Sequence, residues 1–154
     1  MADATFTVER SARVGAPPER VYAAIADFHD WRNWSPWEDV DPDLQRAYSG
    51  ADEGIGAVYE WKGNRKAGEG RMEITEAEAP SRVRIALDFL KPFRSSNVTT
   101  FYLNPADGGT EVRWTMVGPK TLGTRIMGIF KSMDSLVGKD FEKGLRQLDA
   151  HVSS

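Results

Sequence analysis

Hydrophobic and polar residues alternate from the start of the chain. One parity of the first segment is apolar and the other is mainly polar, which predicts a half-buried strand whose inward residues are Phe6, Val8, Ala12 and Val14. Pro17 and Pro18 then suit the start of a helix, because proline presets the backbone angle φ that a first helical turn needs. Apolar residues follow at helical spacing up to Phe28. We therefore expect one strand and then a short helical segment that runs into Trp31.

Six further strands are predicted after this segment, separated by short stretches rich in Gly, Pro, Asn and Ser. Their expected ranges are 44–49, 57–62, 69–77, 82–90, 97–103 and 111–117. Connections this short favour antiparallel neighbours. The clearest alternation, with apolar residues at Val83, Ile85, Leu87 and Phe89, predicts a sheet with one buried and one solvated face.

A long amphipathic helix is predicted at the end of the chain, from about Leu122 to Val152. It would be roughly 45 Å long at 1.5 Å per residue, enough to cross the whole domain. Its glycines weaken the helix by up to about 1 kcal/mol each, so packing must hold it. The apolar stripe consists of Ile126, Ile129, Phe130, Met133, Val137, Phe141, Leu145, Leu148 and Val152.

These elements give an α+β fold in which an antiparallel sheet grips the last helix. The 154 residues fit one domain, 1–154. No cysteine is present, and His29 and His151 lie far apart, with His151 expected in a fraying tail, so we expect no metal site and no thiol chemistry. A net charge of −3 makes nucleic acid an improbable partner. The chain has no apolar stretch long enough to span a bilayer and no N-terminal signal pattern, so a cytoplasmic location is expected.

Several motifs spread over nearly the whole chain resemble one superfamily. They are Ala16-Pro17-Pro18, the tryptophans at 31, 34 and 37 with Asp41-Pro42, Tyr48-Ser49-Gly50, Tyr59 and Trp61 before Gly63-Asn64, Gly68 and Gly70 before Met72 and Ile74, the hairpin from Thr99 to Trp114, and Met133-Asp134 with Phe141, Gly144 and Leu145. The chain resembles the SRPBCC superfamily of START-like and birch-pollen-allergen-like helix-grip domains, in its polyketide cyclase/dehydrase-like branch. The resemblance implies a curved seven-stranded antiparallel sheet around a long C-terminal helix, with short helices between strands 1 and 2. Because this superfamily includes carriers, enzymes and regulators, it does not select one function.

The leading hypothesis is binding, as a carrier or sensor, of a hydrophobic small molecule such as a lipid or a polyketide or other aromatic compound. The alternatives are a cyclase/dehydratase-like enzyme that works without metal, and a regulatory protein-interaction domain. If a cavity is open between sheet and helix, strand parity and the helix stripe predict its lining as Trp34, Trp37, Tyr59, Trp61, Met72, Ile74, Ile85, Leu87, Phe101, Trp114, Met116, Phe130 and Met133. The alternative is that these residues fill a solid core. Gly68 and Gly70 are expected opposite Tyr59 and Trp61, where they either leave room for the rings or only bend the sheet.

No catalytic residue and no cofactor are predicted. The histidines are better explained as surface residues, and no glycine pattern matches a dinucleotide fingerprint. Glu60 and Glu69 are near-opposite carboxylates on one hairpin, but the parity that turns Trp61 inward turns Glu60 outward.

The turns at 63–67 and 91–94 and the link at 118–122 are expected at one end of the sheet, because alternate connections of a meander share an end. An entrance is predicted there, formed by Leu90, Lys91, Phe93, Arg94 and Lys120. The apolar members would close the cavity, and the basic members would attract carboxylated ligands or make a peripheral contact with an anionic membrane. The alternative is a plain solvated turn.

Overall fold

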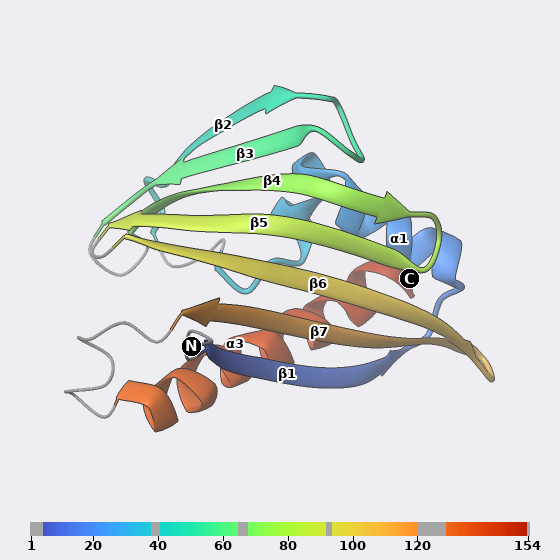
Figure 1. Cartoon of the computed structure of the whole chain (residues 1–154). Helices are drawn as coiled ribbons and strands as arrows, with labels where there is room; N and C mark the ends of the chain where they lie inside the picture. Colours follow the sequence, from blue (N-terminus) through green and yellow to red (C-terminus); the bar gives the residue numbers. More distant parts are fainter. Residues whose placement is uncertain (1–4, 38–40, 65–67, 92–93, 120–128, 154) are drawn as a thin grey trace.

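A computed structural model describes residues 5–37, 41–64, 68–91, 94–119 and 129–153, with the side chains of the last segment from Val137 onward. Seven strands form one antiparallel sheet in the order β1-β7-β6-β5-β4-β3-β2 (Figure 1). The strands are β1 (Thr5–Val14), β2 (Gln45–Gly50), β3 (Ala57–Lys62), β4 (Glu69–Glu78), β5 (Arg82–Lys91), β6 (Ser95–Ala106) and β7 (Gly109–Pro119). The helices are α1 (Pro18–Ala26), the 3-10 helix η1 (Phe28–Asn33) and α3 (Ile129–Val152). The expected α+β arrangement is confirmed.

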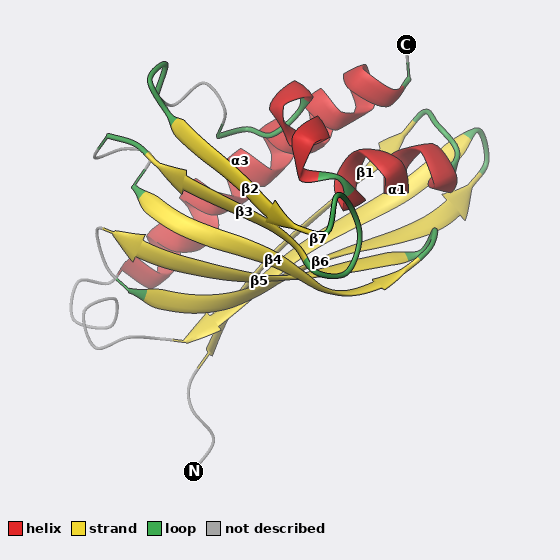
Figure 2. Ribbon diagram, turned by 90° about the horizontal axis from the view of Figure 1, so that it is seen from above, coloured by secondary structure: helices red, strands yellow, loops and turns green. Residues whose placement is uncertain are grey.

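One face of the sheet is buried against the helices. Figure 2 shows α1 and α3 on the same, concave side of the curved sheet. The predicted parity of β5 is correct, since Val83, Ile85 and Leu87 are buried there. From the described part of α3, the buried apolar residues in the core are Phe141, Leu145, Leu148 and Val152. The helix therefore supplies the apolar cover that the sheet requires.

The two ends of the last helix differ from the sequence-based expectation. α3 begins at Ile129 rather than Leu122, and residues 120–128 lie outside the described part of the chain. At the other end, His151 does not lie in a fraying tail. Its Nε2 atom lies 3.0 Å from Asp30 Oδ2 of η1, and Val152 is only 4% exposed. Packing of this last turn against η1 keeps it helical.

Close approach explains why α3 carries glycine despite the cost to helix stability. A Cβ atom at Gly144 would lie 2.9 Å from both Pro36 Cδ and Trp114 Cζ3, so only glycine lets the helix come this near. A Cβ atom at Gly138 would instead meet the guanidinium group of Arg10. That group is the end of a long side chain and can move aside, so Gly138 is the less restricted of the two positions.

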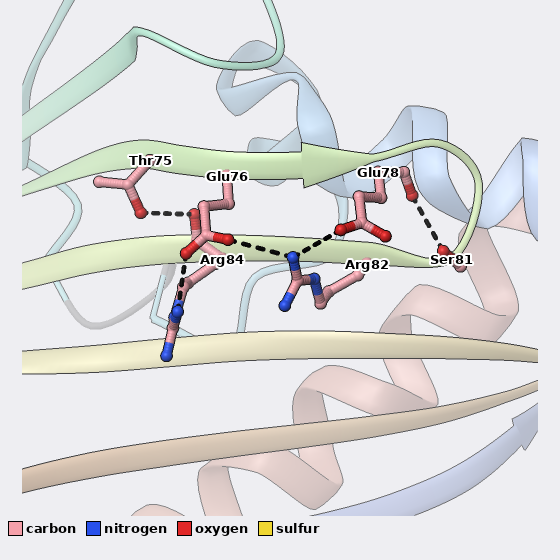
Figure 3. Close-up of polar contacts among 6 residues, drawn as sticks. All are labelled: Thr75, Glu76, Glu78, Ser81, Arg82 and Arg84. Atoms are coloured by element: carbon pink, nitrogen blue, oxygen red, sulfur yellow. Dashed lines mark hydrogen bonds and ion pairs between the residues drawn. The ribbon is translucent and has the colours of Figure 1, made fainter.

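The opposite face of the sheet is mainly polar on β4 and β5 and carries the exposed pair Val98 and Val117 on β6 and β7. Figure 3 shows Glu76 accepting hydrogen bonds from Arg84 at 2.7 Å and from Arg82 at 3.1 Å, while Arg82 also reaches Glu78 at 2.7 Å. The hydrogen bond from Arg84 is the main cause of the lowered pKa of Glu76. A register shift between Ile74 and Glu76 keeps both glutamates on the outer side. Exposed ion pairs of this kind contribute little to stability, so this face is a solvated surface.

Candidate ligand-binding cavity

A cavity of about 260 Å³ lies between the sheet and α3. It is not filled by the inward-facing residues, so the interior is not the solid core that was the alternative expectation. Half of the described residues that line it are aromatic. The described lining residues are Trp31, Ser35, Trp37, Leu44, Tyr59, Trp61, Met72, Leu87, Phe89, Thr99, Trp114, Met116, Val137 and Phe141.

Two rows of side chains on β3, β4 and β5 form one wall. Strand register aligns Tyr59 with Met72 and Met72 with Leu87, all of which line the cavity. The neighbouring row is Trp61, Gly70 and Phe89. Trp61 and Phe89 are half-buried, so this second row lies at the rim of the cavity.

The opposite wall is a stack of aromatic rings. The ring of Phe141 on α3 lies parallel to that of Trp114 on β7, with centroids 4.0 Å apart and an interplanar angle of 6°. Trp37 contacts both rings edge-on, at 5.7 Å from Trp114 and 6.3 Å from Phe141. Large ring faces therefore line the side of the cavity away from β3 and β4.

Three of the four described tryptophans that line the cavity donate their indole N–H groups to the protein itself. Trp31 Nε1 donates to the carbonyl oxygen of Ile25 at 2.8 Å, and Trp37 Nε1 donates to Asp140 Oδ2 at 3.1 Å. Trp114 Nε1 donates to the hydroxyl oxygen of Thr99 at 2.8 Å, and this hydroxyl donates onward to the carbonyl oxygen of Thr115 at 2.7 Å. These indole groups therefore offer the cavity apolar ring surface rather than free hydrogen-bond donors.

Among the described lining residues, the only titratable side chain is the phenol of Tyr59. The described groups with shifted pKa values lie elsewhere. Glu76 and Arg84 are on the outer face, burial raises the pKa of Tyr22 on α1, and hydrogen bonds from Gly15 N and Ser153 lower the pKa of Asp149. Glu60 is exposed and Glu69 is half-buried, and neither lines the cavity. No three His, Asp or Glu side chains in the described part of the chain could together hold a metal ion.

Seven of the residues predicted from the sequence line the cavity, and four do not. Those on the lining are Trp37, Tyr59, Trp61, Met72, Leu87, Trp114 and Met116. Ile74 and Ile85 are correctly placed on the inner face, but they lie opposite each other one step further along β4 and β5, toward the end where α1 packs (Figure 1). Both are fully buried there, so they belong to solid core.

Trp34 and Phe101 are the other two corrections. Phe101 is covered by aromatic neighbours, with its ring stacked on Trp114 at 4.6 Å and in edge contact with Trp31 and Trp34. Trp34 donates its indole N–H to the carbonyl oxygen of Ala24 at 3.0 Å and lies beside a separate polar cleft. Both rings therefore support the lining from behind. Phe130 and Met133 lie, with their side chains, outside the described residues.

Seven lining residues were not among the sequence-predicted set, namely Trp31, Ser35, Leu44, Phe89, Thr99, Val137 and Phe141. Phe89 shares the parity of Leu87, and Val137 and Phe141 belong to the apolar stripe of the helix, so the same signals could have found them. Thr99 also has inward parity, but a hydroxyl-bearing side chain is no signal of an apolar lining. Ser35 and Leu44 lie in irregular segments, for which the sequence carries no comparable signal.

The predicted entrance lies at the end of the sheet where β3 and β5 finish, on the left of Figure 1. Lys91 and Arg94 are exposed, and Leu90 is partly buried. Phe93 and Lys120 lie outside the described residues. The cavity extends toward this end, because the half-buried rim residues Trp61 and Phe89 lie within two residues of the ends of their strands.

A buried carboxylate anchors the segment that borders this end. Asp41 is 8% exposed and accepts hydrogen bonds from the backbone N–H groups of Asp43 and Asn64, each at 2.8 Å. Asn64 is the second residue after β3, so Asp41 joins the segment before β2 to the β3–β4 connection. Leu44, which lines the cavity, lies in the segment that this carboxylate holds.

The chain matches one protein family by sequence and several solved structures by fold. A family model described as polyketide cyclase/dehydrase and lipid transport matches residues 5–153. No curated protein matches the chain by sequence. In the described part of the chain, no helix is both long and apolar enough to cross a membrane.

Three solved structures illustrate the similarity of fold. Protein CV1439 from Chromobacterium violaceum is 20% identical, with 96% of this chain and 97% of that chain covered and a TM-score of 0.70. DynU16, a protein in the dynemicin biosynthetic locus, is 15% identical, with coverages of 96% and 47% and a TM-score of 0.65. Ara h 8.0201 is 14% identical, with coverages of 97% and 98% and a TM-score of 0.59. At such identities these likenesses establish the fold alone.

Proposed function

The chain belongs to the polyketide cyclase/dehydrase and lipid transport family, within the SRPBCC group that its sequence resembles, and we propose that it binds a hydrophobic small molecule as a carrier or sensor. The observation that carries this proposal is the aromatic cavity between the sheet and α3. Binding of this kind needs apolar surface that a ligand can cover, and the aromatic lining supplies it.

The shape and chemistry of the cavity favour a compact aromatic ligand. Its volume of about 260 Å³ is slightly smaller than that of the usual small-molecule site, roughly 300–1,000 Å³. A single aromatic polycycle suits this space better than a lipid with two acyl chains. Trp37, Trp114 and Phe141 line the cavity, and the parts of their rings that are not stacked on one another can pack against an aromatic ligand.

Binding is favoured over cyclase or dehydratase catalysis by the lining itself. Acid-base catalysis needs both a proton donor and a proton acceptor near the reacting atoms. The described lining offers one titratable group, Tyr59. A carrier or sensor requires no such pair.

Native mass spectrometry of freshly purified protein tests the proposal, together with titration of naphthalene followed by tryptophan fluorescence. We expect a retained hydrophobic molecule or saturable binding of naphthalene. Leu87→Trp fills the cavity and should abolish binding, whereas Val98→Trp, at a 38% exposed position on the outer face, should leave it intact. Absence of any binding by folded wild-type protein, or equal binding by folded Leu87→Trp, would reject the proposal.

We further propose that Lys91 and Arg94 form a basic rim that attracts anionic ligands or an anionic membrane surface. Both side chains are exposed at the end of the sheet that the cavity approaches, although Glu69 lies opposite Lys91 in the strand register. Each Lys or Arg near an anionic surface contributes about 1 kcal/mol. Such an attraction weakens as salt screens it.

Charge reversal at both positions tests the rim. Lys91→Glu with Arg94→Glu should weaken binding to vesicles of anionic phospholipid at low salt and leave the thermal unfolding midpoint nearly unchanged. Lys139→Glu with Arg146→Glu makes the same change in net charge at exposed positions of α3 and serves as the control. If both double variants bind the vesicles as wild type does across a salt series, residues 91 and 94 belong to a plain turn.

A further inference from the structure

Gly70 lies in the inward-facing row of the sheet between two aromatic residues. The strand register places it opposite Trp61 on β3 and opposite Phe89 on β5. A Cβ atom at this position would lie 2.5 Å from Trp61 Cζ2, closer still to Cη2, and 2.7 Å from the carbonyl oxygen of Asp88. Real side chains do not make such short contacts, so the indole ring of Trp61 occupies the space that a side chain at position 70 would need.

Neighbouring rings hold the indole in this position. Phe89 meets Trp61 edge-on, with centroids 5.9 Å apart and an interplanar angle of 84°. Tyr59 stacks beside it at 6.2 Å and 28°. The indole thus lies against the backbone of β4, where it lines the rim of the cavity.

The direction in which this ring could move is limited. The sheet blocks movement away from the cavity, and Tyr59 and Phe89 flank the ring on the same face. A ring lifted off position 70 rises from the inner face of the sheet, on the side where Val137 of α3 lines the same cavity. Such a movement would narrow the space available to a ligand.

We propose that Trp61, lying on Gly70, sets the width of the cavity and so determines the largest ligand that the protein accepts. Gly70 acts as a positioning residue, because its missing side chain keeps the indole against the sheet. This inference rests on the proposed binding function and adds a size limit to it. The alternative role of Gly70 is local to the backbone, where the close carbonyl oxygen of Asp88 and the register shift beside Gly70 would require glycine whatever residue stands at position 61.

Two planar, uncharged hydrocarbons of different width separate these roles. The measured quantity is the ratio of the dissociation constant of pyrene to that of naphthalene. Gly70→Ala should raise this ratio about tenfold, since the overpacking it causes falls mainly on the wider ligand. In a Trp61→Ala background, the same substitution should change the ratio by no more than about twofold, as expected for sites that no longer interact.

Gly138→Ala is the matched control. It also adds a methyl group where an existing side chain must move, but that side chain is Arg10 and Gly138 does not line the cavity. We expect the ratio to stay at its wild-type value in this variant. Should Gly70→Ala not fold, Trp61→Phe provides the opposite change, because a smaller ring widens the cavity and should lower the ratio.

The outcomes distinguish this inference from the proposed function. If wild-type protein binds neither hydrocarbon, the proposed binding function itself is wrong. If it binds both and Gly70→Ala leaves the ratio unchanged, binding stands and the size limit is wrong. If the ratio rises equally in the wild-type and Trp61→Ala backgrounds, Gly70 acts through the backbone and the role of Trp61 is refuted. An unchanged ratio in Trp61→Phe refutes it as well.

Discussion

Truncation of Phe141 is the most direct test of how α3 is held on the sheet. The side chain is 1% exposed, stacks face to face on Trp114 and contacts Trp37 edge-on. Phe141→Ala removes both ring contacts and adds the volume of the phenyl ring to a cavity that already exists. The helix has little intrinsic stability to compensate, because Gly138 and Gly144 lie on either side of the residue.

The expected cost of Phe141→Ala is about 3–5 kcal/mol, the usual range for deleting a buried phenylalanine. About 0.5–1.5 kcal/mol of this is the aromatic pairing itself. Phe141→Leu keeps most of the apolar volume and loses the stacking, so its cost should stay below about 1.5 kcal/mol. Arg146→Ala, at an exposed position on the same helix, should change the free energy of unfolding by less than about 0.5 kcal/mol.

Urea titration with the three variants measures these differences, provided that the slope m is shared. Thermal unfolding should agree, with a midpoint lowered by about 2–4 °C for each kcal/mol. A loss of less than about 1 kcal/mol in Phe141→Ala would refute the reasoning. It would mean that the stack on Trp114 contributes nothing and that other contacts hold the helix.

Three further predictions follow from named contacts. Gly144→Ala should lower the free energy of unfolding by about 1–3 kcal/mol in denaturant titration. The clash with Pro36 and Trp114 outweighs the gain of up to about 1 kcal/mol in helix propensity. A variant more stable than wild type would contradict this packing. Asp41→Ala should lower the free energy of unfolding by about 1.5–3 kcal/mol for each lost hydrogen bond. It should also speed amide hydrogen exchange at Asn64 but not in β5. Unchanged exchange at Asn64 would show that its hydrogen bond to Asp41 is unimportant. The hydrogen bonds from Gly15 N and Ser153 lower the pKa of Asp149. Its contribution to stability is therefore full above the ordinary aspartate pKa of 3.8 and is lost as the pH falls through the lower pKa of the folded state. Asp149→Asn should therefore lose less stability than wild type between pH 7 and pH 3 in urea titrations, and equal losses would contradict the shift.

Strand parity predicted which face of each strand is buried, because burial on one face is a local property of the strand. Val83, Ile85 and Leu87 face inward as their alternation indicates, and the strands begin and end within a few residues of the predicted ranges. The same rule cannot tell how deep a residue lies along a strand. Ile85 and Leu87 have the same parity and similar side chains, yet only Leu87 lines the cavity.

A cavity is the space that packing leaves over, so its outline depends on contacts between elements that are distant in the sequence. Ile85 is solid core because it lies opposite Ile74 toward the end where α1 packs, and Phe101 is covered because the tryptophans of the η1 segment and β7 surround it. Neither fact can be read from β5 or β6 alone.

Gly70 is a position at which the sequence itself indicates a contact with a different strand of the sheet. A glycine inside a strand weakens it, so its presence between inward-facing positions requires a reason. The sequence allowed two, room for an aromatic ring or a bend in the sheet. The structure contains the ring of Trp61 in that space and also a register shift beside it. Because the ring and the register shift are both present, only removal of the ring can show which of them requires glycine at position 70. The Trp61→Ala background is therefore the decisive arm of the size-limit experiment, since it leaves the register shift in place and removes the side chain with which an added methyl group would collide.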